Sequence, residues 1–316
     1  MVLFKKKTRR EETSIAEYIF NSIDENGNLP EGFELPDTKD KEVKFAAGAK
    51  DGICMYHMAQ KSLTDADNEK LEELILLAGK GDTSGAEKGF KEFCKKHRMI
   101  SIIDDLQETV LDNEDKLDPN VMFKFAVALF LHSSDIECVK TGLRILELFD
   151  TSDNEELVKA IRKVALCDEF TVFCLFIMRK WPTAEKDILE CAKHVHGWGR
   201  IHCVDYIEPT EKETKEWLLF NGTDNDITAA YSAWDVFIKA DIPALIRRGD
   251  LSYEEMHAVL KITEGLMDEG PVSGLSNMDN PKVFLGDVLF RSEGNYSFTE
   301  EDLKIIENIR AFINRA

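Results

Sequence analysis

The sequence is poor in the two residues that most often interrupt regular secondary structure. Its 316 residues include 18 glycines and 8 prolines, which is about 8% of the chain against an average near 12%. Architectures with many short strands need such residues at their frequent tight turns, whereas helical proteins need fewer of them. The deficit therefore favours an all-α protein.

Long apolar runs are also missing. The most apolar window, residues 121–131, is interrupted by Lys124, and a membrane-spanning helix needs about 20 apolar positions. The first ten residues, MVLFKKKTRR, contain five basic side chains but no apolar segment of signal-peptide length. We therefore expect no membrane span and no export signal, and we interpret residues 1–11 as a solvated basic tail.

Positive charge is scarce relative to negative charge. The chain has 40 Lys and Arg against 60 Asp and Glu, a formal net charge of −20. Phosphate backbones repel such a chain, which excludes general nucleic-acid binding. Hydrophobic residues make up 43% of the chain, enough for a packed core. Because acidic surfaces attract basic segments, we expect a protein or peptide partner of basic character.

The seven cysteines include no C-x-x-C pair and are odd in number. They are scattered through apolar helical patterns, which is typical of buried, reduced thiols in a cytosolic protein. We therefore expect a cytoplasmic location. The residues are Cys54, Cys94, Cys138, Cys167, Cys174, Cys191 and Cys203.

Apolar residues at helical spacing predict helices in the N-terminal part of the chain. We expect these helices at residues 12–23, 41–61, 65–79 and 83–97. Residues 12–117 are accordingly interpreted as an N-terminal helical region.

From residue 118 the helix signals become regular. Capping residues predict that the first helix of each pair starts at Asp118, Ser152, Thr183 and Thr210. The second helices are expected to start near Asp135, Asp168, Trp198 and Asp224. The two sets of spacings shrink together, as expected if each pair of helices is one structural unit.

A recurring helical hairpin cannot bury both of its apolar faces alone, so neighbouring hairpins must stack. The segment FTVFCLFIM, residues 170–178, is apolar on nearly all sides, which predicts a helix packed between neighbours. We therefore predict that residues 118–240 form an α-solenoid of stacked helical hairpins, similar to HEAT and armadillo repeats. Residues 241–316 are expected to form a C-terminal helical region and cap, with helix starts at Pro243, Ser252, Asn280-Pro281 and Thr299.

The only concentration of reactive side chains is the segment CAKHVHGWGRIHCVDY, residues 191–206. Cys191 and His194 share one helix face, and His202 and Cys203 follow the Gly197 turn. These four residues are weak zinc-ligand candidates, because only one side of the turn has a recognised ligand spacing. We therefore expect no metal site and no cofactor.

On the second helix of this segment, Trp198, His202 and Asp205 form one stripe. We expect His202 and Asp205 to pair and Trp198 to be a packing residue. Gly197 and Gly199 are expected to supply the positive φ of a tight corner. The candidate binding residues are Trp198, Arg200, His202, Asp205, Trp217 and Asn221.

No common catalytic signature is present. The chain has no G-x-G-x-x-G dinucleotide motif, no G-x-S-x-G nucleophile elbow and no H-E-x-x-H metal motif. A catalytic group assembled from distant positions would leave no such local pattern. We therefore assign no catalytic residues and expect a non-enzymatic protein.

The segments EFTVFCLFIMRKW and AKHVHGWGRIHCVDYIEPTEKETKEWLLFNGTDNDI carry a family resemblance. Over residues 118–250 the chain resembles an uncharacterised bacterial family of HEAT/armadillo-like helical-repeat proteins with a GWG-(K/R)-IH core and a following WLL-x-x-G-like segment. Cys203 and Asn221 depart from this pattern. Some members carry the name limonene hydroxylase, which implies a monooxygenase that acts on a cyclic terpene.

Three functional hypotheses follow. The first is a non-enzymatic helical-repeat protein that binds a protein or peptide partner through its acidic surface. The second is the monooxygenase implied by the family name, which would require a haem, flavin or metal to activate oxygen. The third is a toxin-neutralising or regulatory partner protein, which an acidic helical surface would suit.

Overall fold

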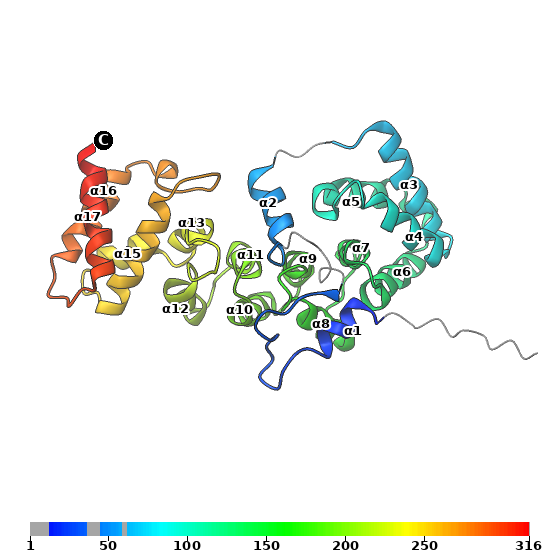
Figure 1. Ribbon diagram of the computed structural model, residues 1–316, viewed down its shortest axis with the longest axis horizontal. Helices are drawn as coiled ribbons and strands as arrows, with labels where there is room; N and C mark the ends of the chain where they lie inside the picture. The colour runs from blue at the N-terminus through cyan, green and yellow to red at the C-terminus, as the bar shows by residue number, and fades with distance from the viewer. Residues whose placement is uncertain (1–12, 37–44, 59–61, 316) are drawn as a thin grey trace, which may run out of the picture. The chain divides into compact units, whose positions relative to one another are not determined.

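The computed structural model describes residues 13–36, 45–58 and 62–315, and within them the protein is all helical (Figure 1). These ranges contain seventeen α-helices and no strand, which confirms the all-α prediction. The predicted basic tail, residues 1–11, lies outside the described residues. No helix in the described part is long and apolar enough to cross a membrane.

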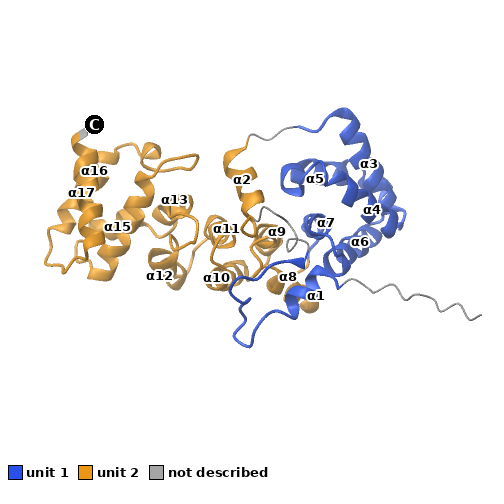
Figure 2. Cartoon of the chain, in the orientation of Figure 1, with its two compact units in different colours: residues 1–44, 61–150 blue, residues 45–60, 151–316 orange. Residues whose placement is uncertain are grey.

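The chain forms two compact units (Figure 2). Unit 1 consists of residues 1–44 and 61–150, and unit 2 consists of residues 45–60 and 151–316. The division between the two units after residue 150 falls within the region 118–240. Unit 2 also takes up a short segment from the N-terminal part of the chain.

Unit 1 contains six α-helices in the described part of the chain. Its helices are α1 (Ile15–Phe20), α3 (Asp65–Gly79), α4 (Thr83–Phe93), α5 (Ile103–Asp112), α6 (Pro119–His132) and α7 (Ile136–Leu146). Asp118 and Asp135 cap α6 and α7 through their carboxylates, as predicted. A Cβ on Gly142 of α7 would lie 2.7 Å from the carbonyl oxygen of Ala126. A glycine is therefore needed where α7 crosses α6.

Unit 2 contains the remaining helices. They are α2 (Ala49–His57), α8 (Glu155–Val164), α9 (Thr171–Met178), α10 (Ala184–His194), α11 (Trp198–Tyr206), α12 (Lys212–Asn221), α13 (Ala230–Lys239), α14 (Ile242–Arg248), α15 (Tyr253–Met267), α16 (Pro281–Ser292) and α17 (Glu300–Arg315).

Successive helices of unit 2 contact one another in pairs, α8 with α9, α10 with α11, and α12 with α13. The second helices also contact in series, since α9 touches α11, α11 touches α13, and α13 touches α15 (Figure 1). Every residue of α9 is buried. This confirms that the apolar segment 170–178 packs between neighbours, where its side chains are removed from water on all sides.

Two helix starts in the C-terminal region agree with the predicted positions. Ser252 forms a capping box with Glu255 at α15, and α16 begins at Pro281 as expected. Helix α8 begins later than predicted, because Asn154 rather than Ser152 accepts the hydrogen bond from the Leu157 N–H. Capping groups therefore locate a helix end closely, but competing polar neighbours shift it.

Helix α13 begins six residues after the predicted position at Asp224. The side chain of Asn225 accepts hydrogen bonds from the backbone N–H groups of Ile227 (3.0 Å) and Thr228 (2.9 Å). These bonds form a turn in place of the first helical turn.

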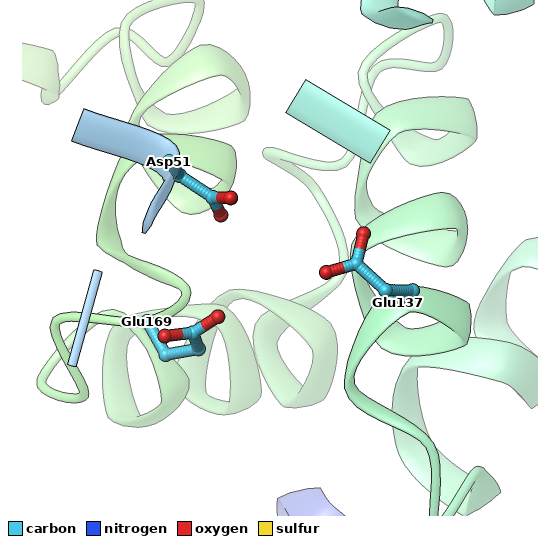
Figure 3. A group of neighbouring side chains, drawn as sticks. All are labelled: Asp51, Glu137 and Glu169. Carbon is cyan, nitrogen blue, oxygen red and sulfur yellow. The ribbon is translucent and has the colours of Figure 1, made fainter. Parts of the chain in front are cut away.

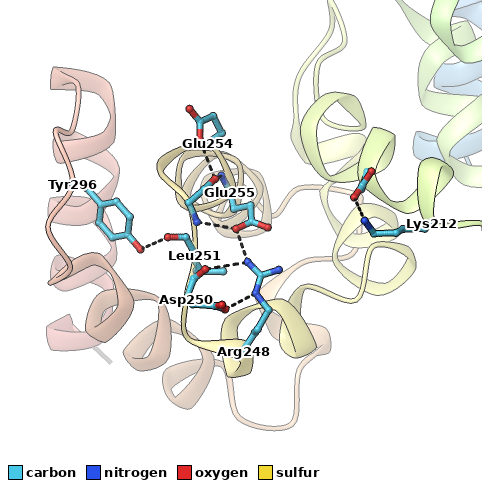
Figure 4. A network of polar contacts seen from close by, with 9 residues as sticks. Lys212, Arg248, Asp250, Leu251, Glu254, Glu255 and Tyr296 are labelled. Carbon is cyan, nitrogen blue, oxygen red and sulfur yellow. Dashed lines mark hydrogen bonds and ion pairs between the residues drawn. The ribbon is translucent and has the colours of Figure 1, made fainter.

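A polar network fixes the connection between α14 and α15 (Figure 4). Arg248 donates to Asp250 Oδ1 (2.6 Å) and to Glu255 Oε2 (2.5 Å). The Tyr296 hydroxyl donates to the Leu251 carbonyl (3.1 Å). Tyr296, which follows α16 in the chain, thus connects the C-terminal helices to the turn between α14 and α15. On α12, Lys212 pairs separately with Glu216 (2.8 Å).

Glu185, in the first turn of α10, holds the start of α12 by hydrogen bonds. Its carboxylate accepts from the N–H (3.0 Å) and hydroxyl (2.5 Å) of Thr210 and from the N–H of Glu211 (2.9 Å). Partial burial acts to raise the pKa of Glu185, but these bonds and one from the Thr214 hydroxyl outweigh it and hold that pKa at about 2.

We expect the substitution Glu185→Gln to lower the free energy of unfolding by about 1 kcal/mol at pH 7, a value reduced for solvent screening. Because the folded-state pKa lies below the unfolded one, this stabilisation is present above about pH 4.5 and is lost as the pH falls towards 2. Denaturant unfolding of both proteins at several pH values measures the difference. A difference that stays constant down to pH 2 would contradict this account.

Candidate functional site

Unit 1 has an acidic groove between α3 and α5, with a volume of about 410 Å³. We use the name acidic groove for the hollow lined by Glu69, Glu72, Asp105, Glu108, Asp112 and Lys116, together with uncharged neighbours. Five of these six charged residues are therefore carboxylates. The helix pair that forms the walls belongs wholly to unit 1.

Helical geometry explains why the carboxylates gather. Glu69 and Glu72 are three residues apart on α3, and Asp105, Glu108 and Asp112 follow the i, i+3, i+7 pattern on α5. Residues at these spacings share one face of a helix. The two acidic faces line the same hollow because the apolar faces of α3 and α5 are buried, as Leu71 and Leu106 illustrate.

The groove contains one cation among its lining residues. Lys116 Nζ lies 3.8 Å from Glu72 Oε1 and donates to Asn113 Oδ1 (2.7 Å). One ammonium group leaves four carboxylates in excess, and like charges in one hollow repel each other. A cationic group entering the groove would relieve this repulsion.

Another carboxylate of unit 1 is that of Glu137 on α7, whose side chain is drawn in Figure 3. It accepts a hydrogen bond from the Met99 N–H (2.7 Å) and pairs with Arg98 (3.3 Å) and Lys140 (3.4 Å). These contacts fasten the short 3-10 helix Met99–Ile102 to α7. Glu137 therefore has a structural role in unit 1.

In unit 2, the GWG motif receives the side chain of Asp168. The Gly197 N–H donates to Asp168 Oδ2 (3.1 Å), and a Cβ on Gly199 would lie 2.6 Å from Asp168 Oδ1. Neither glycine has a positive φ, so the predicted left-handed corner is wrong. Glycine is needed at these positions because the carboxylate approaches the backbone closely. Burial raises the pKa of Asp168 to about 6, against the hydrogen bonds from Gly199 and Gly197.

Trp198 is buried under α2, with 4% of its surface exposed. A Cβ on Gly52 of α2 would lie 2.1 Å from the indole ring of Trp198, so α2 packs through its glycine face. Tyr56 of α2 and Tyr231 of α13 complete the aromatic cluster, with ring centroids 6.0 and 4.9 Å from Trp198. Trp198 therefore acts as a packing residue, as predicted.

Polar contacts fix the start of α2 as well. The Gly48 N–H donates to Glu169 Oε2 (2.9 Å). Asp51, in the first turn of α2, is also buried, and Figure 3 shows its carboxylate together with that of Glu169. Gly48 has a φ of +73°, a conformation that glycine adopts without steric cost.

His202 is buried beside this cluster and stacks on Tyr56, with ring centroids 6.1 Å apart. Among the described residues, neither of its ring nitrogens has a hydrogen-bond partner. The predicted pairing of His202 with Asp205 is therefore wrong, although the two residues lie one turn apart on α11. Burial lowers the pKa of His202 to about 4, so the ring is neutral at pH 7.

Asp205 is half-buried near the end of α11. Burial, and then the nearby charge of Asp235, raise its pKa to about 6, against the opposing charge of Lys239. Lys239 donates to the backbone carbonyls of Val204 (2.8 Å) and Asp205 (2.5 Å) and pairs with Asp235 (3.2 Å). Lys239 thus caps the C-terminal end of α11, where a positive charge is favourable.

The remaining predicted binding residues form a second group around Arg200. The guanidinium of Arg200 donates to the carbonyls of Val195 (2.8 Å) and Asp224 (2.9 Å) and lies 5.6 Å from the ring centre of Trp217. Asn221 donates to the carbonyl of Trp217 (3.1 Å). Arg200 is itself buried, so this group holds two loops in place.

Of the four weak metal-ligand candidates, the structure brings together only the side chains of Cys191 and Cys203. Cys191 donates to the Ala165 carbonyl (3.5 Å), and His194 contacts Glu190 (3.1 Å). No three residues among Cys191, His194, His202 and Cys203 have ligand atoms within 4.8 Å of one another. Burial raises the pKa of the Cys203 thiol well above its usual range.

Sequence reasoning missed the acidic groove and the role of Asp168. The carboxylate spacing on α5 was a usable signal for the groove, but which helix faces α5 is decided by packing. No sequence pattern linked Asp168 to the glycines almost thirty residues further along the chain. Comparison with protein-family models, with curated proteins and with solved structures finds no match to this chain.

The packing of α2 is tested by Gly52→Ala. Alanine favours helix formation by about 1 kcal/mol over glycine, but the added Cβ would overlap the buried Trp198 ring. We expect a net loss of about 2 kcal/mol in the free energy of unfolding. The matched control is Gly286→Ala in the interior of α16, where nothing lies within 4 Å of the added Cβ. The control should be stabilised by up to about 1 kcal/mol, and equal effects of both substitutions would contradict the assigned packing.

The buried charge of Asp205 gives a pH-dependent prediction. Because its folded-state pKa is raised to about 6, its favourable contribution to stability is present below about pH 4 and lost as the pH rises through 6. We expect Asp205→Asn to raise the free energy of unfolding by about 1 kcal/mol at pH 7.5, reduced for partial exposure. The gain should shrink towards zero at pH 4 when denaturant unfolding is compared between the two proteins. A stability gain from Asp205→Asn that grows as the pH falls would contradict this prediction.

Proposed function

We propose that this chain is a non-enzymatic binding protein whose acidic groove receives a basic segment of a partner protein. The observation that carries the proposal is the excess of carboxylates over cations between α3 and α5. A groove of one charge sign attracts a segment of the opposite sign and speeds its association. Hydrogen bonds to carboxylates then favour Lys and Arg over uncharged side chains.

The shape of the groove supports an extended or helical segment rather than a single ion. Glu69 and Glu72 stand on one wall, and Asp105, Glu108 and Asp112 follow one face of the other wall over two helical turns. Carboxylates spread along a helix can each contact a different basic side chain. A partner with several Lys or Arg residues therefore fits better than a single cation.

We also propose that α8 to α13 of unit 2 stack as the helical hairpins of an α-solenoid. The proposal is supported by the paired contacts within each hairpin and by the serial contacts of α9, α11, α13 and α15. Stacked hairpins present long surfaces, and binding proteins use such surfaces for extended partners. The cytoplasmic location is likewise kept as a proposal, supported by six buried free thiols.

The acidic groove is tested with a fluorescent peptide of about twelve residues that contains only Lys, Arg and Ser. Replacing Glu69 and Glu108 together by Gln removes two exposed charges. We expect the peptide to bind the double variant about five- to tenfold more weakly, because each partly screened pair contributes up to about 1 kcal/mol. Fluorescence anisotropy measures the dissociation constants.

The control removes the same number of exposed charges elsewhere, by Glu264→Gln on α15 together with Glu307→Gln on α17. Its affinity for the peptide should change less than about twofold. If both double variants bind the peptide more weakly by the same factor, the net charge of the protein rather than the groove governs binding. An affinity that does not fall as salt rises would also contradict the electrostatic mechanism.

The other two functions remain predictions from the sequence. Oxygenation of a cyclic terpene needs a haem, flavin or metal, so an absorption spectrum and metal analysis of the purified protein test it directly. Neutralisation of a toxin is one form of the proposed partner binding. Genes that neighbour the coding sequence would distinguish a toxin from other basic partners.

A further inference from the structure

The three most exposed large apolar side chains among the described residues all belong to α13 and α16 of unit 2. Val283 and Phe290 of α16 are each 63% exposed, and Ile238 of α13 is 56% exposed. Monomeric proteins scatter exposed apolar residues singly, whereas a concentration of them marks an interaction surface. These residues therefore require an explanation that packing within the unit does not provide.

An apolar groove of about 650 Å³ lies at the same place. We use the name apolar groove for the hollow between α13 and α16 that is lined by Trp234, Phe237, Ile238, Ile246, Val283 and Phe284, with polar residues at its edge. Helix α14, which carries Ile246, packs against both α13 and α16. The rings of Phe237 and Phe284 meet edge to face, with centroids 5.1 Å apart.

Helical spacing extends this surface beyond the hollow itself. Trp234 and Ile238 are four residues apart on α13, and Val283, Asp287 and Phe290 follow the i, i+4, i+7 pattern on α16. Phe290 therefore continues the exposed face that begins at Val283. A small molecule is enclosed by its site over most of its surface, but side chains more than half exposed form a rim that only a macromolecule covers.

The charges at the edge of the groove indicate which macromolecule fits. Among the residues that line the groove, Asp279 and Asp287 are exposed against one cation, Arg247. A second cation, Arg291, lies over the ring of Phe290, 5.4 Å from its centre. A second copy of this chain would bring the same net charge of −20 against them. A partner with Lys or Arg beside its apolar residues is complementary to both features.

The secondary structure of the site narrows the form of the partner. The described residues contain no strand, so they offer no sheet edge to which an extended peptide could add. A hollow between two helices instead accommodates the apolar face of a third helix, whose side chains repeat every three to four residues. We propose that the apolar groove binds an amphipathic helix of a partner protein, with basic residues flanking its apolar face.

This site belongs to unit 2, whereas the acidic groove belongs to unit 1. The two proposals therefore fail independently. Binding at the acidic groove is electrostatic and falls steeply with salt. Binding at the apolar groove buries apolar surface, which salt does not screen.

The test uses the full-length chain and a peptide of about 18 residues built from Leu and Lys in an amphipathic helical pattern. At about 0.5 M NaCl, where the Debye length is only a few ångströms, the peptide should bind and change the fluorescence of Trp234. The variant Trp234→Phe identifies that signal. At about 0.1 M NaCl, where charges are screened less, a peptide with Glu in place of Lys should bind about tenfold more weakly.

The decisive variant is Val283→Ser together with Phe290→Ser, which changes no charge. The matched control is Leu303→Ser together with Phe312→Ser on α17, which are 50% and 36% exposed. We expect the first pair to weaken binding of the Leu/Lys peptide about tenfold or more and the control pair to weaken it less than about twofold. Thermal unfolding by circular dichroism verifies that both variants remain folded.

Three results would overturn the proposal. The first is no binding of the Leu/Lys peptide at about 0.1 mM, a weak affinity for a specific site. The second is equal weakening by the two pairs of substitutions. The third is a concentration-dependent dimer in sedimentation analysis that Val283→Ser with Phe290→Ser abolishes and the control retains, because the groove would then belong to a second copy of the chain.

Discussion

Burial of apolar helical faces against neighbouring helices is the constraint on which the structure depends. Helix α9 shows it most clearly, because all of its residues are buried and it contacts α8, α10 and α11. A helix of this composition cannot be stable alone in water, so its neighbours must cover it. Each neighbour has its own apolar face to cover, which leads to the series of contacts from α9 to α15. The same requirement recruits α2, whose glycine face lets it approach the indole of Trp198.

Packing of this kind leaves polar residues on the outer faces, and their charge determines what the surface can bind. The excess of 20 negative charges is not spread evenly, since five carboxylates line the hollow between α3 and α5. Exposed apolar side chains are also uneven, since the three most exposed large ones among the described residues lie on α13 and α16. Unit 1 thus has a negatively charged hollow and unit 2 has an exposed apolar surface, and the two binding proposals rest on these features.

The sequence predicted features that depend on neighbours along the chain. The caps at Asp118 and Ser252 and the burial of residues 170–178 follow from local hydrogen bonding and from periodicity, and the structure confirms them. Features that depend on distant residues were not predictable. His202 and Asp205 have the spacing of a pair, yet burial leaves the ring without a partner. The acidic groove could be predicted only if α3 and α5 were known to be adjacent. Periodicity along the chain does not give that information.

We propose that a basic segment of a partner binds in the hollow between α3 and α5. Hydrogen–deuterium exchange of the full chain, with and without the Lys/Arg/Ser peptide, tests this most directly because it reports every backbone amide. The account predicts slower exchange of amides in Asp65–Gly79 and Ile103–Asp112, and loss of that protection at high salt. Protection confined to other helices, or unchanged exchange in α3 and α5 at saturating peptide, would contradict it.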